Sequence, residues 1–140
     1  MKETKKEAKR WFLQAKNDYL FVSWILKQEQ FYDKGCFISQ QAGEKALKAC
    51  LYAKGKRYVI GHSLFEMAYE LSETDDSFSP ILNEVKRLDR FYIPTRYPNG
   101  LPGGSPFEIY SQQDLADALH DLKKIMNAAK SFLRKHHIDI

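Results

Sequence analysis

Polar side chains recur at three- and four-residue steps between residues 41 and 48, and their chemistry suits an anion site. They are Gln41, Glu44, Lys45 and Lys48. Residues at these steps share one face of a helix, where the two lysine ammoniums could bind a phosphate while the amide and the carboxylate orient them. Two other interpretations stay open: a solvent-exposed Glu44–Lys48 ion pair that slightly stabilises the helix, and a closely packed polar interface.

A second candidate group is Arg96-Tyr97-Pro98, which lies in a stretch rich in proline and glycine. The prolines stiffen the backbone, so the guanidinium could be held in position to donate two parallel hydrogen bonds to a carboxylate or phosphate. The neighbouring Tyr97 ring could stack on a base. The alternative is that Arg96 pairs with Glu44 or another acidic residue and attaches the loop to the rest of the fold.

His62 directly precedes Ser63, where a helix is expected to begin. A neutral imidazole at a helix entrance can donate or accept one hydrogen bond, and such a histidine is more often structural than catalytic. Arg57 precedes it by five positions, which gives an Arg-x4-His pattern short enough to arise by chance. The sequence contains no P-loop, GxGxxG, GxSxG or HExxH motif.

Capping signals and apolar periodicity predict five helices and no strand that could position these groups. Thr4 with Glu7, Ser63 with Glu66 and Ser111 with Asp114 form capping boxes, Asp33 is a good N-cap, and Ser79-Pro80 is a typical helix start. The expected helices span residues 4–27, 33–54, 63–71, 79–92 and 111–136. Between the last two lies one long connection, and connections of that length are often functional.

The bulk properties are those of one domain over residues 1–140, because 44% of the residues are hydrophobic and 14% aromatic. No apolar run approaches the ~18 residues of a membrane span, and the amino terminus has no apolar signal core. We therefore expect a cytoplasmic protein without a membrane partner. Cys36 and Cys50 would lie about 21 Å apart on one helix, so we expect free buried thiols in a reducing compartment. No His/Cys spacing suggests a metal site.

The formal net charge of +4 is concentrated at the two ends of the chain, since the first ten and the last twenty residues each carry five basic and two acidic residues. This distribution permits nucleic-acid binding, although two solvated helix faces explain it as well. Aromatic residues are crowded on and just after the first helix, more than one helix face can bury, and exposed apolar patches mark interfaces. We therefore expect a homodimer.

Three motifs taken in order resemble the HEPN domain, the nucleotide-binding helical domain of higher eukaryotes and prokaryotes. They are residues 40–49, His62-Ser63-Leu64 and Arg96-Tyr97-Pro98, and the similarity extends over nearly the whole chain. The resemblance implies an antiparallel up-and-down four-helix bundle with an additional short helix, usually paired as a homodimer. It also implies association with a nucleotide, such as ATP or GTP, or with RNA, and a minimal nucleotidyltransferase as partner.

Some HEPN proteins are metal-independent endoribonuclease toxins of toxin–antitoxin pairs, and these carry an Arg-x4-6-His motif near the start of the last long helix. Arg96 occupies the comparable region, but no histidine follows it in residues 97–103. We therefore favour a non-catalytic, nucleotide- or RNA-binding HEPN-like domain without a cofactor. Its site would be lined by Gln41, Glu44, Lys45, Lys48, His62, Arg96 and Tyr97. There are two alternatives. One is a ribonuclease that uses Arg96 and His62. The other is a protein-interaction module whose polar residues only hold the helices of the bundle together.

Overall fold

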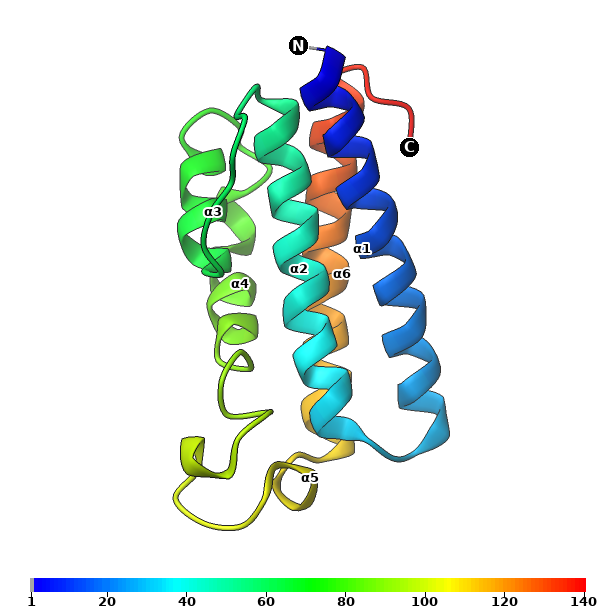
Figure 1. Cartoon of the computed structure of the whole chain (residues 1–140), viewed down its shortest axis with the longest axis vertical. Coiled ribbons are helices and arrows are strands. Elements are labelled where there is room, and N and C mark those ends of the chain that lie inside the picture. Colours follow the sequence, from blue (N-terminus) through cyan, green and yellow to red (C-terminus); the bar gives the residue numbers. More distant parts are fainter. Residues whose placement is uncertain (1) are drawn as a thin grey trace.

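Four helices of alternating direction form the body of the protein. The computed structural model describes residues 2–140, which form helices, turns and loops without a β-strand. The bundle consists of α1 (Lys2–Gln28), α2 (Tyr32–Ala53), α4 (Leu82–Asp89) and α6 (Gln112–Lys135). The additional short helix α3 (Leu64–Ser72) lies beside α4 (Figure 1). The predicted all-α, up-and-down four-helix architecture with an extra short helix is confirmed.

The helix starts are partly as predicted. Ser111 and Asp114 form a reciprocal capping box, and the Ser63 hydroxyl accepts a hydrogen bond from the Glu66 amide. The carboxylate of Asp89 also caps this helix start, because it accepts hydrogen bonds from the Leu64 and Phe65 amides at 2.8 and 2.9 Å. This contact joins the start of α3 to the end of α4.

Two predicted caps are wrong. Helix α1 begins at Lys2, so Thr4 lies inside the first turn. Helix α2 begins at Tyr32 after Phe31, whose φ of 62° is left-handed, so Asp33 is not the N-cap but a buried residue of the first turn. There a carboxylate still interacts favourably with the helix dipole.

The segments around the fourth helix also differ from expectation. The predicted helix over residues 79–92 is a 3-10 turn, η1 (Ser79–Ile81), followed by the shorter α4. The connection after it holds a second 3-10 turn, η2 (Pro98–Gly100), and a one-turn helix, α5 (Pro106–Ile109). The described chain therefore has six α-helices rather than five, and the additional one, α5, lies where a long loop was predicted.

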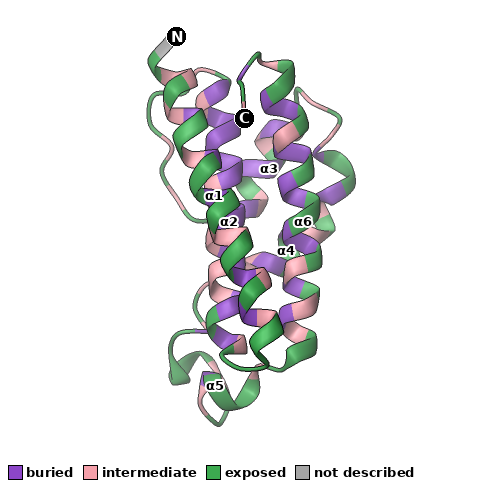
Figure 2. Cartoon of the chain, turned by 90° about the vertical axis from the view of Figure 1, so that its right-hand side faces the viewer, coloured by how far each residue is buried: buried purple, intermediate pink, exposed green. Residues whose placement is uncertain are grey.

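Helix α2 occupies the centre of the bundle because its small residues let other helices approach. A Cβ atom on Gly35 would lie 2.6 Å from a Leu115 methyl carbon of α6, and one on Gly43 would lie 2.8 Å from a Leu64 methyl carbon of α3. Buried residues follow the inward faces of the helices in Figure 2, while the outward faces are exposed. The largest fully buried side chains include Phe12, Phe78, Phe132, Leu47, Leu88 and Leu122.

Both cysteines are free and buried, which confirms that prediction. Burial, together with the nearby carboxylates of Asp114 and Asp33, raises the pKa of the Cys36 thiol, and burial raises that of Cys50. Both thiols therefore stay protonated and weakly nucleophilic at neutral pH. None of the described helices has the length and apolar character that crossing a membrane requires.

Candidate functional site

The Arg96 guanidinium lies over three aromatic rings beyond the end of α4. Its Cζ atom is 4.6 Å from the centroid of Phe37, 4.6 Å from that of Tyr92 and 5.1 Å from that of Tyr97. Its Nε donates a hydrogen bond to the Tyr92 carbonyl oxygen at 2.8 Å. No carboxylate in the described part of the chain contacts this guanidinium. Its terminal nitrogens are therefore available to an external anion.

The turn that follows α4 fixes this arginine in place. The Thr95 hydroxyl donates a hydrogen bond to the Phe91 carbonyl, and the Arg96 amide donates to the Ile93 carbonyl at 3.1 Å. Thr95 is buried, whereas Arg96 and Tyr97 are exposed. The backbone of Arg96 is thus held by a closed turn, and its side chain by stacking, which is worth about 0.5–1 kcal/mol per ring at exposed sites.

His62 shares the Tyr92 ring with Arg96. Its imidazole stacks on Tyr92 with centroids 4.9 Å apart, and its Nδ1 lies 2.9 Å from Oε1 of Glu44. Because a carboxylate only accepts hydrogen bonds, Nδ1 carries the proton, and Nε2 is left to accept a hydrogen bond or, in the imidazolium, to donate one. The His62 imidazole and the Arg96 guanidinium thus each lie within 5 Å of the centroid of the same tyrosine ring.

Gln40 and Gln41 hold the connection before α3 against α2. Gln40 Nε2 donates to the His62 carbonyl at 3.1 Å, and Gln41 Nε2 donates to Gln40 Oε1 at 2.7 Å. Gln40 is fully buried and Gln41 half-buried. Gln41 therefore does not contact His62 itself but orients the Gln40 amide that holds the His62 carbonyl.

Glu44 and Lys48 form a buried ion pair, so the interpretation as a solvent-exposed pair is wrong. Oε2 of Glu44 lies 3.3 Å from the Lys48 ammonium, and the two side chains are 7% and 8% exposed. The ammonium also lies over the Trp11 ring of α1, 5.4 Å from a ring centroid. Arg96 does not pair with Glu44, because His62 and Lys48 occupy the two carboxylate oxygens.

Lys45 does not share a hollow with Arg96. Its ammonium lies 2.6 Å from Oδ2 of Asp18, an ion pair that ties α2 to α1. Lys45 lines a hollow beside Trp11, whereas Arg96 lines one of about 370 Å³ with Asp33 and Phe37. Lys48 lies eleven residues beyond Phe37 on α2, about 16 Å along the helix axis. The predicted residues therefore do not line one pocket, because Lys45 and Arg96 line different hollows.

The structure adds Phe37 and Tyr92 to the residues predicted from the sequence. Phe37 is half-buried and lies beneath Arg96. Tyr92 lies four positions before Arg96, a spacing that brings side chains together on one helical turn and could have indicated the contact. Arg57, in the connection after α2, is exposed.

Comparison with known proteins decides the family. Residues 8–132 match the family model of the HEPN domain. The chain belongs to the HEPN domain family. The HEPN chain is 29% identical to a Methanocaldococcus jannaschii protein named "Putative toxin MJ1304", over 94% of this chain and 91% of the relative.

Three solved structures share the fold. TT1696 from Thermus thermophilus superposes with a TM-score of 0.83 at 31% identity, covering 90% of this chain and 98% of that one. ST0689, described as an archaeal HEPN homologue, gives 0.74 at 29% identity, covering 91% and 98%. The HEPN domain protein TM0613 from Thermotoga maritima gives 0.57 at 26% identity, covering 91% and 94%.

Proposed function

We propose that this HEPN chain binds a nucleotide, or a short stretch of single-stranded RNA, on the surface formed by His62, Tyr92, Arg96 and Tyr97. The observation that carries the proposal is the Arg96 guanidinium, which is oriented by three rings and contacts no carboxylate in the described part of the chain. An arginine held in this way is ready to bind a phosphate through two parallel hydrogen bonds.

His62 and Tyr97 complete the proposed surface. The Nε2 atom of His62 would donate to a phosphate oxygen in the imidazolium form, and the His62 side chain is 57% exposed. The Tyr97 ring is 49% exposed and offers a face for stacking by any base, a contact worth about 1–3 kcal/mol. Lys45 and Lys48 are left out of this binding surface, because their ammoniums already contact carboxylates.

Titration of labelled ATP, GTP and a short single-stranded RNA against wild type and Arg96→Ala tests the proposal. We expect the dissociation constant of at least one ligand to rise by roughly tenfold or more in Arg96→Ala, because a charge-assisted phosphate contact is lost. Arg90→Ala is the matched control, an exposed arginine on the same segment. Equal affinity of all three proteins, or no binding by any of them, would contradict the assignment.

The proposal includes a homodimer. Phe21 and Trp24 near the end of α1 stack with centroids 6.2 Å apart, and together with Phe31 they are 48%, 57% and 57% exposed. A cluster of exposed rings of this kind marks an interface. Sedimentation of wild type as a dimer and of Trp24→Glu as a monomer is the expected result, and a monomeric wild type at micromolar concentration would contradict it.

A minimal nucleotidyltransferase is the proposed protein partner. Family membership and the toxin name of the M. jannaschii relative support this part of the proposal. A nucleotidyltransferase gene beside the gene for this chain, and co-purification of the two products, are the expected findings.

A metal-independent ribonuclease is the second candidate, and the Glu44–His62 contact favours it. A histidine whose Nδ1 is held by a carboxylate presents Nε2 as a general base, and Nε2 could take the proton of a ribose 2′-hydroxyl. Arg96 would then stabilise the charge that develops on the phosphate. RNA cleavage in EDTA that is lost in His62→Ala and in Arg96→Ala would support this role, while intact RNA after incubation with pure wild type would exclude it.

A further inference from the structure

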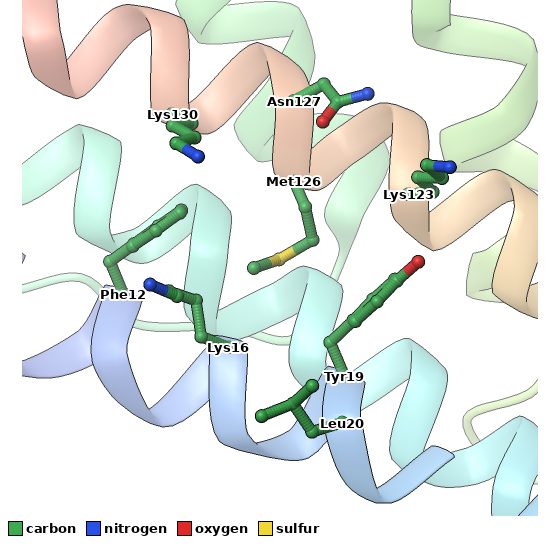
Figure 3. Close-up of a pocket in the computed structure, with 8 residues that line it drawn as sticks. All are labelled: Phe12, Lys16, Tyr19, Leu20, Lys123, Met126, Asn127 and Lys130. Carbon is green, nitrogen blue, oxygen red and sulfur yellow. The ribbon is translucent and has the colours of Figure 1, made fainter. Parts of the chain in front are cut away.

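An open hollow of about 240 Å³ lies between α1 and α6, on a side of the bundle that the proposed nucleotide surface does not use. Its floor is apolar, because Phe12 is buried and Met126 is 8% exposed, and Leu20, which is 64% exposed, lies at its edge. Figure 3 shows Phe12 projecting from α1 and Met126 from α6 toward the space between the two helices. We call this hollow the α1–α6 groove.

Three lysines surround the apolar floor. Lys16 comes from α1, and Lys123 and Lys130 come from α6, so both walls of the groove are basic (Figure 3). No acidic residue lines the groove, and within residues 2–140 none of these three ammoniums forms an ion pair with a carboxylate. The three ammoniums are therefore available to carboxylates of a partner, unlike those of Lys45, Lys48 and Lys56, which each contact a carboxylate of this chain.

Exposed leucines on α1 continue the apolar surface beyond the groove. Leu20 lines the groove and is 64% exposed, and Leu13, which does not line it, is 45% exposed and lies seven residues earlier, on the same face of α1. Exposed leucines at this spacing, beside basic residues, suit a helix that lays its apolar face into a groove. A partner helix would pack its apolar residues on Leu13, Leu20 and Met126.

We propose that the α1–α6 groove docks an acidic amphipathic helix of a partner protein, whose glutamate or aspartate carboxylates meet Lys16, Lys123 and Lys130. Charge complementarity selects this occupant. A second copy of the chain, in a two-fold contact, would bring the lysines of both copies together. An RNA backbone would match the lysines but would leave the apolar floor uncovered. The proposal does not depend on the nucleotide-binding function.

The test uses a fluorescein-labelled designed helix with leucines on one face and glutamates along both flanks. Fluorescence anisotropy compares it with two peptides, a scrambled peptide of the same composition and one with lysine in place of every glutamate. We expect saturable binding of the acidic amphipathic peptide to the full-length wild-type protein, and binding at least about tenfold weaker for the other two.

Two groove variants, each with a matched control, locate the site. Combined Lys16→Glu, Lys123→Glu and Lys130→Glu should weaken peptide binding by roughly tenfold or more, because the attraction becomes repulsion. The control is combined Lys27→Glu, Lys54→Glu and Arg90→Glu, which makes the same charge change on exposed residues outside the groove. Leu20→Gln tests the apolar surface, and Ile60→Gln, at an exposed residue outside the groove, is its control. We expect both controls to bind within about twofold of wild type.

The proposal is overturned if the acidic peptide shows no saturable binding up to about 1 mM, or if the scrambled peptide binds equally well. It is also overturned if the charge control weakens binding as much as the groove variant. If the groove variant changes only RNA affinity or self-association, the groove has another occupant and the proposal is wrong. Circular dichroism of every variant confirms that each one is folded.

Discussion

Arg87 and Arg96 lie nine positions apart, and their surroundings assign them opposite tasks. Arg87 donates from Nε and from a terminal nitrogen to the two oxygens of Asp121, at 3.1 and 2.8 Å, and Asp121 is 2% exposed. Its hydrogen bonds to Asp121 and the charge of that carboxylate raise the pKa of Arg87. Arg96 donates only to a backbone carbonyl and lies over aromatic rings. The first arginine joins α4 to α6, and the second presents its charge to solvent.

The two arginines differ in whether their charged groups already contact a carboxylate of this chain. A charged side chain with such a partner is structural, and one without it can face a ligand. By that criterion Lys45, Lys48 and Glu44 are structural, like Arg87, although they lie on the same helix as Phe37. Arg96 and the Nε2 atom of His62 are left for a ligand. The predictions below test this division.

The largest effect is expected for Glu44→Ala. The substitution leaves the Lys48 ammonium, in a residue only 7% exposed, without its carboxylate. Breaking a buried ion pair from one side costs about 3–5 kcal/mol, so we expect a loss near 3 kcal/mol in the free energy of unfolding, measured with urea. Glu66→Ala, at an exposed position, is the control. If both variants lost a similar, small amount of unfolding free energy, Glu44 would not be structural and would belong with the ligand-facing residues.

Asp121→Ala should be the next most destabilising change. We expect a loss of about 2 kcal/mol in the free energy of unfolding, because a bidentate charge-assisted contact disappears. The loss is smaller than for Glu44 because Arg87 is half exposed and can be hydrated when its partner is removed. Asp117→Ala, an exposed position on the same helix, should cost little. If Asp121→Ala weakened RNA binding without a change in stability, the Arg87 region would not be structural.

Tyr92→Leu should separate stability from binding. The ring contacts both the Arg96 guanidinium and the His62 imidazole, so its loss frees both groups to move. We expect RNA or nucleotide affinity to fall by roughly fivefold while the free energy of unfolding changes by about 1 kcal/mol or less. Tyr69→Leu, an exposed tyrosine on α3, is the control. Unchanged affinity in Tyr92→Leu would show that the shared ring has no part in ligand binding.

The helical architecture could be predicted from the sequence because its signals are local. The apolar period of α1, α2 and α6 and the caps Ser63 and Ser111 marked most boundaries to within a few residues. The four-residue helix α5 is too short to show a period. The start of α2 depends on the left-handed backbone of Phe31, for which the sequence has no glycine signal.

The candidate site was harder to predict because pairing depends on the tertiary fold. Lys45 and Lys48 looked available on α2, but Asp18 and Trp11 of α1 cover them once the helices pack. Arg96 and His62 were named from the sequence, whereas the ring that lies beside both was not. A helical period identifies a face and cannot identify which residues of other elements cover it.

The smallest expected effect is on stability in acid. It concerns Asp75, a further charged residue whose carboxylate already has partners in the fold. Burial tends to raise the pKa of Asp75, but hydrogen bonds from Ser77 and the charge of Lys135 outweigh burial and lower it. A carboxyl with a lowered pKa in the folded state stabilises the fold above its unfolded pKa near 4, and this contribution is lost as the pH falls through the folded value. Asp75→Asn should therefore be less stable than wild type at pH 7.

Urea titrations of wild type and Asp75→Asn from pH 7 down to pH 3 measure this difference. The gap between the two proteins should narrow as the medium becomes acidic, because protonated Asp75 resembles asparagine. The exposed Asp76→Asn is the control. A gap that stays constant over the whole range would show that Asp75 contributes through packing and not through its charge.

The most direct test of the account compares Arg87→Ala with Arg96→Ala in two assays, urea unfolding and RNA or nucleotide titration. We predict that Arg87→Ala loses about 2 kcal/mol of stability and keeps its affinity, while Arg96→Ala loses roughly tenfold or more in affinity and at most about 1 kcal/mol of stability. Equal losses of affinity in both variants, or a loss of stability in Arg96→Ala as large as in Arg87→Ala, would contradict it.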